Sequence, residues 1–100
     1  MPVFFHRLAD DEYVRASRAY ARQDPDVARR FREAVESLLA DIEAAPAIGS
    51  PAFRVYRWRR VRRFSYVLYY REVAADTIVV YAVAHTRRKP GYWLRRPGRP

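Results

Sequence analysis

The 100-residue sequence contains no cysteine and only two histidines, His6 and His85, far apart in the chain. The absence of cysteine excludes disulfides and thiolate ligands, and two distant histidines are too few to predict a zinc site. The longest apolar runs, 66–70 and 78–84, are much shorter than the roughly 20 residues of a membrane-spanning helix. At the N-terminus, His6 and Arg7 interrupt a short apolar stretch, which does not fit a signal peptide. We therefore expect a cytoplasmic protein with no metal or other cofactor.

Acidic residues are scarce in the second half of the chain. Residues 51–100 hold 13 of the 20 lysines and arginines but only two acids, Glu72 and Asp76. Residues 1–50 hold seven arginines and nine acids. The net charge of +9 is therefore the sum of −2 on the first half of the chain and +11 on the second half. Self-repulsion of this size lowers folding stability and is easier to explain if the surface meets an anionic partner. Nucleic acid, an acidic protein segment and anionic lipid are the three candidates.

The first half predicts one strand and two helices within a single domain. Val3–Leu8 is short, aromatic and β-prone. The acids that follow favour a helix N-terminus, and this first helix extends to about Gln23. Asp24-Pro25-Asp26 then starts a second helix, with apolar residues at i, i+3 and i+4 spacing, which Ala45-Pro46 ends. The two helices should form an antiparallel hairpin whose first helix directs inward Tyr13, Ala16, Ala19 and Tyr20.

The second half changes to a period of two. After a turn at 47–51, the segments 53–57, 64–71 and 77–85 read as strands, and the last two form a hairpin. The order β-α-α-β-β-β predicts a small α+β domain with the helical hairpin packed on one face of an antiparallel sheet.

Alternation along the last two strands assigns their faces. The uniformly aliphatic set of the final strand, Ile78, Val80, Ala82 and Ala84, should lie under the helices, although one bulge would reverse this assignment. The opposite face would then carry an open apolar patch of Val67, Tyr69, Tyr81 and Val83, rimmed by arginine. Open apolar patches on small domains commonly bind partners.

The arginines between 54 and 63 are the strongest functional signal. Six occur within ten residues, and arginine suits bidentate contact with phosphate or carboxylate; they are Arg54, Arg57, Arg59, Arg60, Arg62 and Arg63. The pattern does not distinguish between polyanions. Charge reversal at Arg57 and Arg60 together should sharply weaken binding of the anionic partner.

Element order, spacing and charge together resemble the RelE/ParE superfamily, the toxin halves of type II toxin–antitoxin operons. The similarity covers essentially the whole chain, which assigns residues 1–94 to the toxin domain and 95–100 to a basic tail. It implies a cognate antitoxin with an acid-bearing amphipathic segment that covers the open sheet face and the arginines. Three segments carry it: Ile48-Gly49-Ser50-Pro51, Arg62-Arg63-Phe64-Ser65-Tyr66-Val67-Leu68-Tyr69-Tyr70-Arg71, and Ile78–Pro90 followed by Tyr92-Trp93.

The RelE branch of the superfamily resembles a ribosome-dependent mRNA endonuclease. On that reading Arg87 would balance transition-state charge, His85 would be the base, and Arg88 with Trp93 would contact the nucleic acid. Val67 stands where that branch has an arginine, however, and the indole of Trp93 cannot exchange a proton as tyrosine does. The plainer alternatives are that His85 closes a strand end, Arg87 and Arg88 are solvated, and Trp93 anchors the tail.

The ParE branch resembles a gyrase poison with no catalytic chemistry, and this chain is more similar to it. The long second helix, the Gly/Pro turn, a Tyr-Val pair in the third strand and the His85-x-Arg87 ending carry that similarity. The resemblance implies inhibition of DNA gyrase, with an mRNA endonuclease or a degenerate, antitoxin-binding member as the alternatives.

Overall fold

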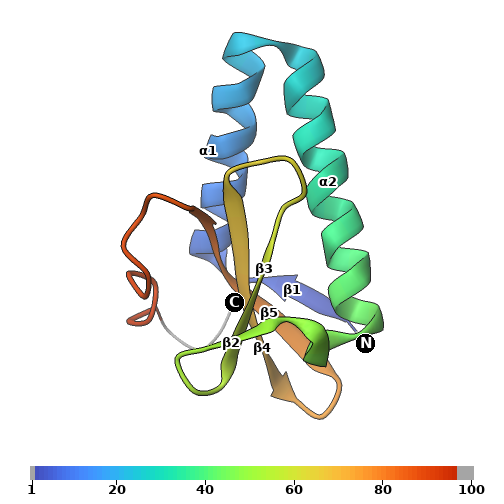
Figure 1. Ribbon diagram of the computed structural model, residues 1–100, viewed down its shortest axis with the longest axis vertical. Helices are drawn as coiled ribbons and strands as arrows, with labels where there is room; N and C mark the ends of the chain where they lie inside the picture. The colour runs from blue at the N-terminus through green and yellow to red at the C-terminus, as the bar shows by residue number, and fades with distance from the viewer. Residues whose placement is uncertain (1, 97–100) are drawn as a thin grey trace.

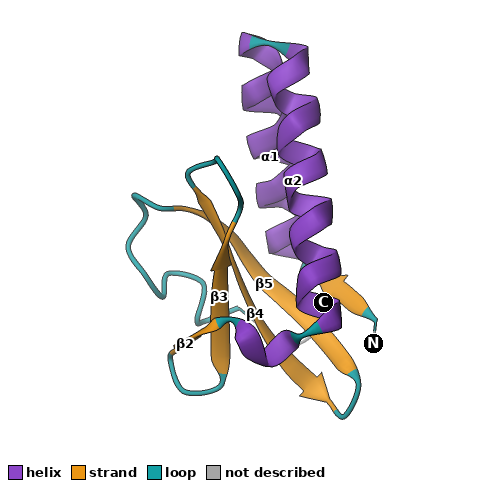
Figure 2. Ribbon diagram, turned by 45° about the vertical axis from the view of Figure 1, so that its right-hand side comes forward, coloured by secondary structure: helices purple, strands orange, loops and turns teal. Residues whose placement is uncertain are grey.

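The computed structural model describes residues 2–96, which form two helices, one short 3₁₀ helix and five strands (Figure 1). The two helices stand side by side against one face of the sheet, and the α1–α2 turn projects beyond it (Figures 1 and 2). In chain order the elements are β1 (Val3–Phe5), α1 (Arg7–Gln23), α2 (Pro25–Ala44), η1 (Pro46–Ile48), β2 (Ser50–Ala52), β3 (Tyr56–Arg60), β4 (Tyr66–Ala74) and β5 (Thr77–His85).

Local capping fixes the helical hairpin much as the sequence predicts. The Asp24 side chain accepts a hydrogen bond from the Asp26 N–H, and Pro25 occupies the first turn of α2. The helix ends at Ala44, before Pro46. Helix α1 starts at Arg7, a little earlier than predicted, because His6 Nδ1 accepts the Leu8 N–H and caps it.

The sheet has the order β1-β5-β4-β3-β2. The predicted α+β class with a helical hairpin on one face is confirmed, but the sheet is mixed because β1 pairs with β5 in parallel. Several boundaries were wrong: β1 ends at Phe5 and not at Leu8, and β4 covers Tyr66–Ala74 and not 64–71. The segment predicted as a turn at 47–51 contributes η1 and the start of β2, and the strand expected at 53–57 runs instead over Tyr56–Arg60.

A β-bulge reverses the predicted faces at the end of β5. Tyr69 pairs with Ala82 whereas Tyr70 pairs with Val80, so one extra residue, Tyr81, is accommodated on β5. Ile78 and Val80 lie under the helices, as expected. Past the bulge the alternation shifts by one residue, so Val83 joins the core beneath the helices while Ala82 and Ala84 join the cluster on the opposite, outer face.

The outer face is not the open apolar patch that the alternation predicted. The chain after β5 turns back across this face, and Trp93 packs there with 0% of its surface exposed, in contact with the rings of Tyr56 and Tyr69. Consequently Val67 and Tyr81 are buried beneath this segment and Tyr69 is half-buried. Trp93 therefore anchors the segment after β5 by packing. Because its ring is buried in this arrangement, it presents no surface on which a base could stack.

Candidate functional site

Four of the six clustered arginines meet at one groove. An open groove of about 740 Å³ lies between α2 and the β3–β4 turn. Cationic side chains from both elements surround it, and its apolar residues come mainly from α2. Its lining comprises Arg30, Arg59, Arg60, Arg62, Arg63, Val27, Ala34, Leu38, Phe64, Ser37 and Asp41.

The β3–β4 turn is held by its two apolar residues. Val61 is buried, and its N–H donates to the Tyr66 carbonyl at 2.9 Å. The Phe64 ring packs edge-on against Phe31 of α2 at 5.2 Å between centroids. Since Val61 and Phe64 anchor the turn, the arginines that alternate with them are held at the groove.

The charge of the groove is strongly one-sided. Five arginines line it against a single acid, Asp41. Guanidinium groups form bidentate hydrogen bonds with carboxylates and phosphates, and the apolar lining offers area for aliphatic side chains. The groove therefore suits a partner segment that is both acidic and amphipathic. A uniform polyanion would match the arginines but would have no side chains for the apolar lining.

The other two clustered arginines lie elsewhere. Arg57 donates through Nη1 to the Gly49 carbonyl at 2.8 Å, so it ties β3 to the segment after η1. Arg54 precedes β3 in the β2–β3 turn, whereas Arg62 and Arg63 follow β3, so the two sets lie at opposite ends of the strand. Within the groove, Arg60 Nε donates to the Phe64 carbonyl at 3.1 Å.

His85 is half-buried at the end of β5, with its ring edge-on to Tyr66 at 5.2 Å. Its Nδ1 accepts the backbone N–H of Arg87 at 3.0 Å. The lone pair of Nδ1 is therefore engaged by the main chain. This geometry matches the strand-closing role of His85. Arg87 itself is exposed just beyond it.

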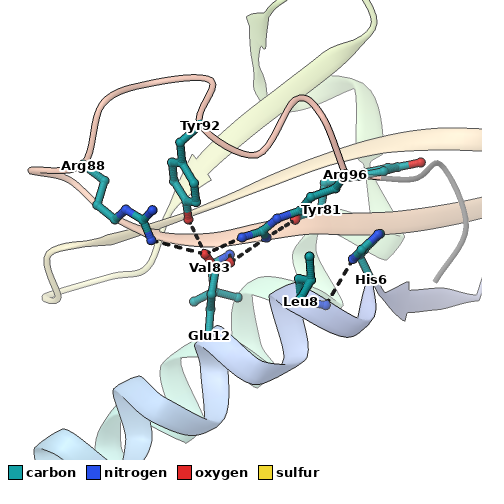
Figure 3. Close-up of polar contacts among 8 residues, drawn as sticks. All are labelled: His6, Leu8, Glu12, Tyr81, Val83, Arg88, Tyr92 and Arg96. Carbon is teal, nitrogen blue, oxygen red and sulfur yellow. Dashed lines mark hydrogen bonds and ion pairs between the residues drawn. The ribbon is translucent and has the colours of Figure 1, made fainter.

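A buried carboxylate, which the sequence predicted only as one of the acids at a helix N-terminus, joins α1 to the chain after β5 (Figure 3). Glu12 is only 7% exposed. It receives two hydrogen bonds from Arg96, at 2.8 and 2.9 Å, one from the Tyr92 hydroxyl, and one from the Val83 N–H at 3.0 Å. Arg88 lies 3.7 Å from the same carboxylate and stacks 3.6 Å above the Tyr92 ring.

The partners of Glu12 decide its charge state. Burial by itself raises the pKa of Glu12, but the hydrogen bonds from Arg96, Tyr92 and Val83 outweigh it and lower the pKa below 4.5. The hydrogen bond to Glu12 raises the pKa of Arg96, and burial raises that of Tyr92. Glu12 and Arg96 therefore form an ion pair that fastens the covering segment. Arg96 belongs to the predicted basic tail, 95–100, of which 97–100 lie outside the described residues.

The lowered pKa of Glu12 predicts how stability depends on pH. A carboxyl group whose folded pKa lies below its unfolded value stabilises the fold above the unfolded value, near 4.5, and loses that contribution as pH falls through the folded pKa. Urea unfolding between pH 7 and pH 2.5 should show this acid loss. A Glu12→Gln variant, which cannot titrate there, should show a shallower loss. An acid limb of the same depth in both proteins would contradict the assignment.

Glu12 could have been found from its spacing. It lies three residues after Ala9 and four before Ala16, both buried, so it occupies the inward stripe of α1. A single acid within an apolar stripe signals a buried pair. The partner, Arg96, is 84 residues away and carries no local signal.

Among residues 2–96, no group of three histidine, cysteine, aspartate or glutamate side chains is placed to hold a metal ion. Over the same residues, neither helix combines the length and the apolar character needed to cross a membrane.

Fold and site together define a class: a small basic α+β domain with a helical hairpin on a mixed sheet and an arginine-lined groove beside the second helix. Residues 3–90 match the family model of the ParE toxin of type II toxin-antitoxin system, parDE. The chain belongs to this family and is a toxin of a type II toxin–antitoxin system. No curated protein matches it.

Proposed function

We propose that this chain is a ParE-type toxin that inhibits DNA gyrase by binding and that its cognate antitoxin neutralises it. The proposal rests on membership of the ParE toxin family. The site geometry favours it over catalysis at the strand end, because the Arg87 N–H engages Nδ1 of His85 and Trp93 is buried. Val67, also buried, offers no side chain that transfers protons or grips phosphate.

The lining of the arginine-lined groove suggests which segment of the antitoxin binds there: one with both acidic and apolar side chains. An amphipathic helix could place apolar side chains against Leu38 and Phe64 while its carboxylates meet the surrounding guanidinium groups. Such a segment can be disordered when free and fold on binding, which makes neutralisation reversible. Antitoxin contact with the outer-face residues Tyr69 and Tyr81 remains a prediction, and it requires the chain after β5 to move aside.

An mRNA endonuclease is the second candidate, and the exposure of Arg87 directly after β5 favours it. The two candidates differ in the macromolecule attacked, so two assays with the purified toxin separate them. With gyrase, ATP and supercoiled plasmid, we expect linear plasmid to accumulate. In a cell-free translation reaction programmed with preformed mRNA, primer extension should detect no new cuts.

Each outcome of these assays is decisive. Cuts that occur only on translated mRNA, with gyrase unaffected, would overturn the gyrase proposal and establish the nuclease. Inactivity in both assays, with the antitoxin still bound, would identify a degenerate member. An Arg87→Ala variant adds a further check, since full toxicity would remove the nuclease role from that residue.

A further inference from the structure

Three exposed apolar side chains lie at the end of the molecule that carries the β2–β3 turn. Phe53, Val55 and Leu94 are 42%, 60% and 39% exposed. Phe53 and Val55 belong to the turn between β2 and β3, and Leu94 belongs to the segment after β5. We call these three residues the apolar knuckle.

The knuckle joins parts of the chain that are far apart in sequence. A Cβ atom added to Gly91 would lie 3.0 Å from both the Phe53 ring and Leu94 Cδ1, so both side chains lie against this glycine. The Phe53 ring also stands edge-on to the buried Trp93 at 5.7 Å. The knuckle is therefore a supported feature of the tertiary structure and not a loose loop.

The backbone of the turn is strained where it presents the knuckle. Phe53 and Arg54 have φ angles of 46° and 73°, in the left-handed region that side chains other than glycine and asparagine rarely adopt. Two consecutive non-glycine residues in this region are uncommon, and strain of this kind concentrates at functional sites.

The charges beside the knuckle are uncompensated. Arg54 and Arg95, the immediate neighbours of Phe53 and Leu94, are exposed. Within residues 2–96, neither guanidinium group has an ion pair or hydrogen-bond partner. Apolar side chains flanked by free arginines complement a protein surface with an apolar depression and carboxylates around it.

Resting on the proposed function, we propose that the apolar knuckle is the surface by which this toxin binds gyrase, at an apolar depression ringed by carboxylates. The knuckle lies at the end of β3 opposite the arginine-lined groove, so the antitoxin and the target engage different surfaces. Neutralisation then acts by steric exclusion or by altering the toxin, and the antitoxin does not fill the target site.

The test compares variants of the knuckle with a control substitution elsewhere on the surface of the full-length toxin. Val55→Ser with Leu94→Ser removes apolar area from the knuckle, and Val73→Ser, at a valine of β4 that is 37% exposed, is the control. Phe53→Asn removes the ring at a backbone angle that asparagine tolerates, so the turn itself is not disrupted. Binding to purified gyrase holoenzyme, plasmid cleavage, antitoxin binding and thermal unfolding are measured for each.

We expect the double serine variant and Phe53→Asn each to bind gyrase at least about tenfold more weakly, while Val73→Ser binds as wild type does. Affinity for the antitoxin segment that binds the groove should be unchanged in all of them, because none of the substituted residues lines the groove. Arg54→Glu with Arg95→Glu should weaken gyrase binding and reduce its dependence on salt.

The outcomes separate this inference from the proposed function. If wild type neither binds nor inhibits gyrase, the proposed function fails, and the assignment of the knuckle fails with it. If wild type inhibits gyrase and the folded knuckle variants do so equally well, only the knuckle assignment is overturned. Loss of antitoxin binding in place of gyrase binding would move the knuckle to the antitoxin interface, and loss of self-association alone would make it a contact between copies. Undiminished binding by the arginine variants would overturn the acidic character of the partner surface.

Discussion

A Glu12→Ala variant is expected to lose about 3–5 kcal/mol of folding free energy, the typical cost of removing one member of a buried ion pair. The substitution leaves Arg96, with a side chain only 13% exposed, without its carboxylate, and leaves the Val83 N–H without an acceptor. It also removes the carboxylate that fixes the Tyr92 hydroxyl. Because 1 kcal/mol corresponds to about 4–8 °C in a domain of this size, the thermal midpoint should fall by roughly 12 °C or more.

The control for this prediction removes both charges together. In Glu12→Leu with Arg96→Met, no charge is left buried without a partner, so this variant should be considerably more stable than Glu12→Ala. Tryptophan fluorescence adds a local readout, since Trp93 lies in the segment that the ion pair fastens. Equal stability of wild type and Glu12→Ala would show that the pair does not fasten that segment.

Reversing two charges of the arginine-lined groove, Arg59→Glu with Arg62→Glu, is expected to weaken antitoxin binding by about 100-fold or more. Loss of a desolvated, hydrogen-bonded charge contact costs about 2–5 kcal/mol, and each 1.4 kcal/mol is a factor of ten in affinity. The geometry makes this a cleaner pair than Arg57 with Arg60, which donate to the Gly49 and Phe64 carbonyls and also stabilise the fold. Titration calorimetry with the antitoxin of the same operon measures the change.

The matched control for the groove is Arg7→Glu with Arg18→Glu. Both residues are exposed on α1 and neither lines the groove, so the variant changes the net charge equally while leaving the groove intact. It should bind the antitoxin with at most a small change from long-range electrostatics, removable by salt. Equal losses in the two variants would reduce the role of the groove to general charge attraction.

The helical hairpin could be predicted from sequence almost completely. Its signals are local: the Asp24 cap, Pro25 at the first turn, the apolar spacing of α2 and the stop before Pro46. β5 was likewise predicted with its observed bounds, Thr77–His85, because β-branched and aromatic residues dominate it. The clustering of six arginines between residues 54 and 63 also needed only the order of residues along the chain.

The sheet faces required the tertiary structure. Alternation gives each residue a face only while the register is regular, and the bulge at Tyr81 moved Val83 under the helices. The strand β2 was missed because three residues with a proline carry almost no strand signal, and pairing with β3 alone makes them a strand.

What the sequence by itself determined is the set of elements, their order and the basic character of the second half, because capping, periodicity and charge act between near neighbours. Only the tertiary structure decided that Trp93 covers the outer face, that Glu12 is buried against Arg96, and that Phe53 lies against Gly91. Each of these contacts joins residues tens of positions apart. The energy of such contacts comes from burial and desolvation, which exist only after the chain has folded.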